Sequence, residues 1–152
     1  CAQSARYQTG VSTYTIIDRE RALLIARDND VHGVDRLSLV TSGHSVDEIT
    51  LRQLAELYAE IRQKTAMDCC ASMGFLDPDR ADQLLAMGVS RYHCNLEANK
   101  ASFPKICTSH SWQDKVNTLK IAETARMSLC SGGIIGMGES MNDRIDLALE
   151  LR

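Results

Sequence analysis

The sequence predicts an α/β fold, built as a partial TIM-type (β/α) barrel of parallel strands with outer helices. Helical and extended patterns alternate along all 152 residues, which favours βαβ units over a helical bundle. No interior segment has the composition of a linker, so one domain is expected over residues 1–152. Four strands do not close a barrel that needs eight. We therefore expect a domain that is cut at both ends.

The first half of the chain contains the first two helices and the first strand. Residues 16–30 have the apolar spacing of a helix, and Gly33 lies just beyond its end. Residues 37–41 form a short apolar run typical of a strand. Residues 45–48 have the form of a capping box, which predicts a second helix that ends near Thr65. The residues of the first helix expected to face inward are Ala22, Ile25 and Ala26.

The second half repeats the alternation of strands and helices. Asp77 as N-cap and Pro78 at the first helical position predict the start of a helix. Ser111 and Ser140 are expected to cap two further helices. The other elements expected here are strands at 67–73, 89–96 and 127–135 and a long polar loop at 98–110.

Composition excludes several classes of function. Seventeen basic residues stand against twenty acidic ones, and no basic stripe is present, so no nucleic-acid partner is expected. No apolar run approaches the roughly 20 residues that span a bilayer, and residues 1–30 lack a secretion signal. We therefore expect no membrane partner and a cytoplasmic location. The six cysteines lie near strand ends, which favours thiolate chemistry in a reducing compartment over disulfides.

Unusual residues follow each expected strand. In parallel α/β sheets the functional groups gather at the carboxyl ends of the strands, because the following loops converge there. The residues at these positions are Ser42, Gly43 and His44 after the first strand, Cys70 and Ser72 at the second, Asn95 and Glu97 at the third, and Cys130 at the fourth.

Asn95 and Glu97 form a candidate polar site. They are two residues apart, so on an extended backbone their side chains point to the same face. Such a pair suits the hydroxyls of a ribose. From spacing alone, a strand-end turn with a solvated acid is an equal alternative.

The segment 130–140 reads CSGGIIGMGES and combines glycines with an apolar wall. Glycines allow the backbone to approach a ligand closely, and the apolar residues suit a flat adenine better than a pyrophosphate. The segment is not a P-loop, because no Lys follows the glycines. Glycines at a tight turn can also serve backbone geometry alone.

The segment 130–140, with YHCNLE at 92–97 and CAQSARY at 1–7, resembles the biotin synthase family of radical S-adenosylmethionine enzymes. The resemblance implies a radical SAM (β/α) barrel. Members carry a CxxxCxxC loop whose three thiolates hold a 4Fe-4S cluster, and Cys1 matches the third of them. The two preceding cysteines are absent from these 152 residues. We therefore expect this chain in isolation to be inactive.

The resemblance also implies roles for individual residues. Asn95 and Glu97 match positions that bind the ribose and methionine side of S-adenosylmethionine. His110 matches a basic position near the methionine carboxylate. His93 and Asn95 are expected near the substrate, as the catalytic pair. The other implied cofactor-binding residues are Gly132, Ile134, Gly136 and Glu139 at the adenine, and Ser42 and Gly43 after the first strand.

A second, auxiliary iron–sulfur cluster is the proposed sulfur source in this family. Typical members hold a 2Fe-2S cluster with three cysteines and an arginine. Cys70 and Cys130 match two of these cysteines, Ser38 stands near the third, and the arginine would lie beyond Arg152. Extra cysteines occur at two other positions. The resulting hypothesis is a 2Fe-2S or variant cluster with ligands drawn from Cys70, Cys94, Cys107 and Cys130.

Cys94 raises a difficulty for this hypothesis. On a regular strand it points away from Asn95 and Glu97. Its alternative role is that of a small buried hydrophobic residue.

The implied reaction is the insertion of sulfur into dethiobiotin to form biotin, with an electron donor such as flavodoxin or ferredoxin and a homodimeric enzyme. One alternative is another radical SAM enzyme of the same subfamily, such as a maturase without the sulfur-donating cluster. A second is a non-catalytic metal-binding or scaffold fragment. In that case the same four cysteines could hold zinc, although the close CxxC spacing of zinc ribbons is missing.

Overall fold

The computed structural model describes residues 8–12, 14 and 16–152, so Cys1 lies outside the described residues. Its centre is a parallel sheet in the order β1-β2-β3-β4. This arrangement confirms the α/β fold with parallel strands and outer helices. The strands are β1 (Arg36–Val40), β2 (Asp68–Ser72), β3 (Val89–His93) and β4 (Ser128–Cys130).

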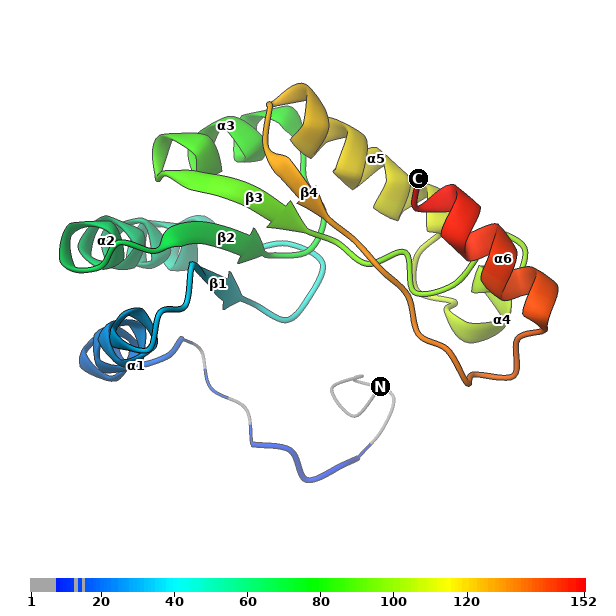
Figure 1. The fold of residues 1–152 in the computed structure, drawn as a ribbon, viewed down its shortest axis with the longest axis horizontal. Helices are drawn as coiled ribbons and strands as arrows, with labels where there is room; N and C mark the ends of the chain where they lie inside the picture. Colours follow the sequence, from blue (N-terminus) through cyan, green and yellow to red (C-terminus); the bar gives the residue numbers. More distant parts are fainter. Residues whose placement is uncertain (1–7, 13, 15) are drawn as a thin grey trace.

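Helices cover one face of the sheet, called here the outer face (Figure 1). The opposite, inner face carries none of the described helices, and the side chain of Val40 on it is 69% exposed. Two helices, α4 and α6, lie beyond the carboxyl ends of the strands (Figure 1). None of the described helices is both long and apolar enough to cross a bilayer. The helices are α1 (Arg19–Val31), α2 (Glu48–Lys64), α3 (Pro78–Ala86), α4 (Phe103–Ile106), α5 (Trp112–Thr124) and α6 (Met141–Glu150).

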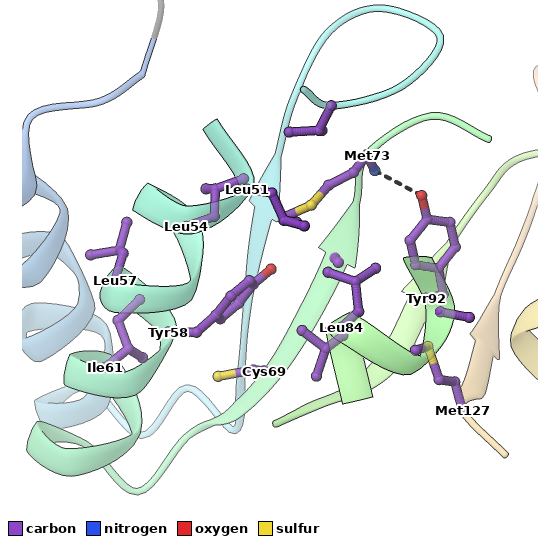
Figure 2. Close-up of a cluster of buried hydrophobic side chains, with 14 of the residues drawn as sticks. Leu51, Leu54, Leu57, Tyr58, Ile61, Cys69, Met73, Leu84, Tyr92 and Met127 are labelled. Carbon is purple, nitrogen blue, oxygen red and sulfur yellow. Dashed lines mark hydrogen bonds between the residues drawn. The ribbon is translucent and has the colours of Figure 1, made fainter. Parts of the chain in front are cut away.

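The hydrophobic core lies between the sheet and the outer helices. One face of α2 packs its apolar side chains onto β2, where Cys69 is buried (Figure 2). Tyr92 of β3 is fully buried; its hydroxyl accepts from the Met73 amide at 3.1 Å and donates to the Gly74 carbonyl at 2.8 Å. Each large side chain buried here contributes about 1.5–3 kcal/mol. This packing fixes which side chains of each strand face the outer helices and which face the open inner side of the sheet.

A β-bulge in β3 changes the phase of that strand. Cys69 pairs with Val89, but Cys70 pairs with Arg91, so Ser90 has no partner of its own. The bulge puts Tyr92 on the outer face and turns Arg91 to the inner face beside Cys70. His93, two residues further, also faces inward and pairs with Cys130.

Most of the N-cap residues predicted from the sequence cap a helix in the structure. Asp77, Ser111 and Ser140 each accept a hydrogen bond from a backbone amide of the first turn, as expected. The predicted capping box at 45–48 is wrong. Asp47 is the N-cap of α2, because its carboxylate accepts from the amides of Ile49 and Thr50.

Three further predictions differ from the structure. α1 begins at Arg19 rather than at residue 16, since Asp18 caps it. Ala22 and Ala26 are buried as expected, but Ile25 is 41% exposed because the buried face of α1 is narrow. The polar loop at 98–110 contains α4, which Phe103 anchors by complete burial.

The strands β3 and β4 are shorter than predicted. The regular strand β3 ends at His93, and Glu97 has a left-handed backbone with φ 68°. The strand β4 ends at Cys130, before the glycines. A left-handed residue and a run of glycines both interrupt regular extension, which an apolar run in the sequence does not reveal.

Candidate functional site

Cys130 and His93 form the centre of the candidate site. They are register partners on β4 and β3, and the Cys130 Sγ lies 3.1 Å from the His93 Nδ1 in a hydrogen bond. Cys70 lies on the same inner face, one step nearer the amino ends of the strands, and is 5% exposed. β3 separates the two cysteine strands, so their backbones lie roughly 9–10 Å apart.

This distance between the two cysteine strands suits a cluster of several metal ions better than a single metal ion. Within residues 8–12, 14 and 16–152, no three His, Cys, Asp or Glu side chains converge on one metal ion. The alternative of a zinc ion held by Cys70, Cys94, Cys107 and Cys130 is therefore contradicted. A cluster contains bridging sulfides and so can span a wider gap between its thiolates.

Cys94 lies on the wrong face for a shared cluster. Its side chain belongs to the buried core under the outer helices, and burial raises the pKa of its thiol. Cys94 follows His93, the last residue of β3, and its side chain packs in the core whereas His93 contacts Cys130 on the inner face. This placement contradicts the expectation that Cys94 joins Cys70 and Cys130.

Cys107 belongs to a second thiol–imidazole group, at the end of α4. Its Sγ lies 3.5 Å from the His110 Nδ1 and 3.5 Å from the Ser109 Oγ. Burial raises the pKa of the Cys107 thiol, but hydrogen bonds from Ser109 and His110 outweigh it, so the pKa lies below its usual value. Cys107 and His110 line a groove of about 380 Å³.

The ring of His110 lines this groove and also contacts residues at the carboxyl edge of the sheet. It packs on His44 from the loop after β1, on Phe75 from the loop after β2, and on Phe103 of α4. Burial lowers the pKa of His110, and the positive charges of Lys115 and His44 lower it further. His110 is therefore mostly a neutral ring at neutral pH.

Asn95 and Glu97 lie beside the glycine-rich segment. The Glu97 amide donates to the Gly132 carbonyl at 3.1 Å, and the Ile134 amide donates to the Glu97 carbonyl at 2.8 Å. A Cβ on Gly132 would lie 3.5 Å from the Asn95 Oδ1, so the amide side chain lies against that glycine. Partial exposure alternates through His93, Asn95 and Glu97, which places all three toward the same side.

Several buried polar atoms at this edge lack a hydrogen-bond partner among the described residues. Three of them follow strands directly or closely: Thr41 Oγ1 after β1, Glu97 Oε2 after β3 and Ser131 Oγ after β4. Unpaired buried polar atoms are rare in proteins, and each needs an explanation. Thr41 and Ser131 were not among the residues predicted from the sequence, although both directly follow a strand. Together these atoms fit a ligand that carries hydroxyl and amine groups.

The glycine-rich segment folds back onto α6. A Cβ on Gly133 would stand 2.9 Å from the Glu97 carbonyl oxygen and 2.4 Å from the Leu147 Cδ2, so only glycine fits. Gly136 has φ 102°, which also favours glycine. Ile134 exposes 51% of its surface and so leaves an apolar side chain open on this segment.

Glu139 holds this segment in place. Its carboxylate accepts from the amides of Gly136 at 2.8 Å and Met137 at 2.7 Å, and from the Arg144 Nε at 2.8 Å. Hydrogen bonds from the Gly136 and Met137 amides, with that from Arg144, lower the pKa of Glu139 to about 2. Glu139 therefore shapes the loop rather than facing a ligand. Ser42 and Gly43 lie exposed in the loop after β1, at the same edge.

Comparison with known proteins gives relatives along the whole chain. The biotin synthase of Desulfotalea psychrophila is 51% identical over 152 residues, which are all of this chain and 45% of that protein. The biotin synthase of Acetivibrio thermocellus is 45% identical over the same 152 residues, 48% of its length. The chain thus spans about half the length of the curated relatives it matches.

Solved structures agree on the fold. Methylornithine synthase (PylB) superposes with a TM-score of 0.82 at 15% identity, over 99% of this chain and 44% of that one. The hydrogenase maturase HydG from Carboxydothermus hydrogenoformans has a TM-score of 0.75 at 17% identity, over 95% of this chain and 35% of that one. The model of the radical SAM superfamily matches residues 1–151. The chain belongs to the radical SAM superfamily.

Proposed function

We propose that this protein is a biotin synthase, which inserts sulfur into dethiobiotin to form biotin. The observation that carries the proposal is the position of Cys70 and Cys130 on one inner face, beside the polar strand ends. Identity of 45–51% to two named biotin synthases along all 152 residues supports the same reaction.

Membership of the superfamily implies S-adenosylmethionine and a 4Fe-4S cluster. When bound, these cofactors supply one-electron chemistry that removes hydrogen from unactivated carbon. Cys1, outside the described residues, is the proposed cluster ligand of this chain. The unpaired Glu97 Oε2 and the Asn95 amide would hold ribose hydroxyls.

Other residues would complete the pocket for S-adenosylmethionine. Gly132 allows close approach of the backbone, and Ile134 provides the apolar wall for the adenine. Gly136 and Glu139 would shape that wall. The neutral ring of His110, with Ser42 and Gly43, is proposed at the methionine end.

An auxiliary iron–sulfur cluster is the proposed sulfur source. Cys70 and Cys130 would be its ligands, and Cys107 is a further candidate from the neighbouring loop. The His93 hydrogen bond to Cys130 would orient that thiolate. With Asn95, His93 would also contact dethiobiotin, which would put both residues between the two proposed cofactor positions.

The remaining parts of the proposal concern the cellular setting. The free thiols fit a reducing cytoplasm. Flavodoxin or ferredoxin is the proposed electron donor, and the proposed assembly is a homodimer. The 152 residues alone are expected to be inactive, because they supply one of the three cysteines of the 4Fe-4S cluster.

The test uses full-length protein, reconstituted without oxygen with iron and sulfide. We expect wild type to convert dethiobiotin to biotin, and we expect Cys70→Ser and Cys130→Ser to lose both biotin formation and auxiliary iron and sulfide. Cys69→Ser is the matched control, because Cys69 faces the outer core. Cys107→Ala decides whether Cys107 is a ligand. A wild-type protein with only one 4Fe-4S cluster and no biotin formation would instead be another radical SAM enzyme.

A further inference from the structure

Arg91 places a cation in the middle of the inner face. It lies on β3 with Cys70 on one side and Ser128 of β4 on the other. The bulge at Ser90 is what turns it there, since a regular strand would have paired Cys70 with Ser90 and sent Arg91 outward.

The guanidinium of Arg91 lacks a counter-charge in the described part of the chain. Its Nε is buried and has no hydrogen-bond partner. Arg36, one step nearer the amino ends on the same face, shows the contrast. It donates to the Asp68 carboxylate at 2.8 Å and to the Ser90 hydroxyl at 2.9 Å. A partly buried charge without a partner is costly, so Arg91 is arranged for an anion that binds at this level of the face.

The sulfur of Cys70 is the candidate anion at this level, because Cys70 is the register partner of Arg91 and faces the same side. Cys70 is 5% exposed. The carboxylate of Glu97 stands further along, beyond the end of β3. A thiolate is the anion that this layer can supply.

We propose that Arg91 is a positioning residue of the auxiliary cluster, and that its guanidinium compensates the negative charge of the Cys70 thiolate and of the cluster that this thiolate would hold. This inference rests on the proposed function. A cation beside a cluster stabilises its reduced form, which carries one more negative charge, and so raises the midpoint potential.

The test compares Arg91→Met, Arg91→Gln and Arg91→Lys in full-length, anaerobically reconstituted protein. The readouts are iron and sulfide per chain and a redox titration of the auxiliary cluster. For both neutral variants we expect at least a tenfold lower ratio of reduced to oxidised cluster at fixed potential, which is about 59 mV for one electron. Arg91→Lys should recover most of that shift. Arg36→Met, the matched arginine already paired with Asp68, should leave it unchanged.

The outcomes separate this inference from the proposed function. If the wild-type protein holds no auxiliary cluster, the proposed function and the proposed role of Arg91 are both overturned. If wild type holds it and the neutral variants match wild type in sulfide content and potential, only the role of Arg91 is overturned. If Arg91→Met shows no cooperative thermal unfolding, Arg91→Gln carries the decision, because it keeps a polar side chain with hydrogen-bond donors and removes the charge.

Discussion

Polar side chains at the carboxyl edge of the sheet are of two kinds. Some have hydrogen-bond partners for their polar atoms, and others have a buried polar atom without a partner among the described residues. Glu139 accepts hydrogen bonds from two amides of the loop that it shapes and from Arg144 of α6. Glu97, Thr41 and Ser131 each have one buried oxygen without a hydrogen-bond partner in the part of the chain that the structure describes. A satisfied carboxylate stabilises the fold, whereas an unsatisfied one is available to a ligand. Glu97 and Glu139, which lie 42 positions apart in the sequence, therefore have different roles in the site.

Glu97→Gln should weaken binding of S-adenosylmethionine. The substitution replaces an accepting oxygen with a donating amide, and a hydrogen bond to a charged group is worth about 1.5–3 kcal/mol. We expect affinity to fall roughly 10- to 100-fold by titration calorimetry on reconstituted protein. Glu123→Gln, on the exposed surface of α5, is the control. Equal affinity of wild type and Glu97→Gln would rule out ribose binding by this carboxylate.

Acidification should loosen the glycine-rich loop. The folded pKa of Glu139 is about 2, below its usual value of 4.5, so its stabilisation is present above about pH 4.5 and is lost as the pH falls toward 2. The pKa of Asp143 is also lowered, first by the Ser140 hydroxyl and amide and then by Ser102 and Asn99, so it adds to the same trend.

Urea unfolding of full-length protein at pH about 5 and about 3 measures this effect. Wild type should lose stability between the two values, and Glu139→Gln should lose less. The variant should also be less stable than wild type at pH about 5. Identical pH dependence of the two proteins would show that the Glu139 carboxylate does not hold the loop.

At the scale of elements, the bulge in β3 and the turn of the glycine segment decide which side chains meet. The bulge turns Arg91 and His93 inward and keeps Tyr92 in the core. The segment after β4 continues to bond with the chain after β3 through Glu97, Gly132 and Ile134. These irregular connections extend the sheet toward α6 and build the wall of the candidate site.

Gly133→Ala should destabilise the protein more than Gly132→Ala. The new Cβ at 133 would stand 2.9 Å from the Glu97 carbonyl oxygen, whereas at 132 its nearest atom lies at 3.5 Å, an ordinary contact. Overpacking of this kind costs about 1–3 kcal/mol. Thermal melting of the two variants measures the difference, and equal melting temperatures would show that the segment can move away from Glu97.

At the scale of the whole molecule, the sheet is open. In the described part of the chain, β1 and β4 each pair on one side only. The inner face has no helix over it, and α6 exposes an apolar stripe of Met141, Ile145 and Leu149. A sheet edge without a partner tends to pair with another chain.

The 152-residue polypeptide alone should therefore associate or aggregate. Light scattering after size exclusion, at a few concentrations, tests this expectation. We expect dimers or larger species whose share grows with concentration, because edges and apolar stripes of separate copies can cover one another. A monomer with a sharp thermal transition would contradict it.

The sequence by itself determined the order of elements and most helix starts, because caps such as Asp77, Ser111 and Ser140 act within one turn of the chain. It also placed Cys130 at a strand end, whereas Cys70 lies in the middle of β2. The tertiary structure decided which face each side chain takes. The bulge at Ser90, the left-handed Glu97 and the core position of Cys94 depend on packing between distant strands and helices, which local spacing does not contain.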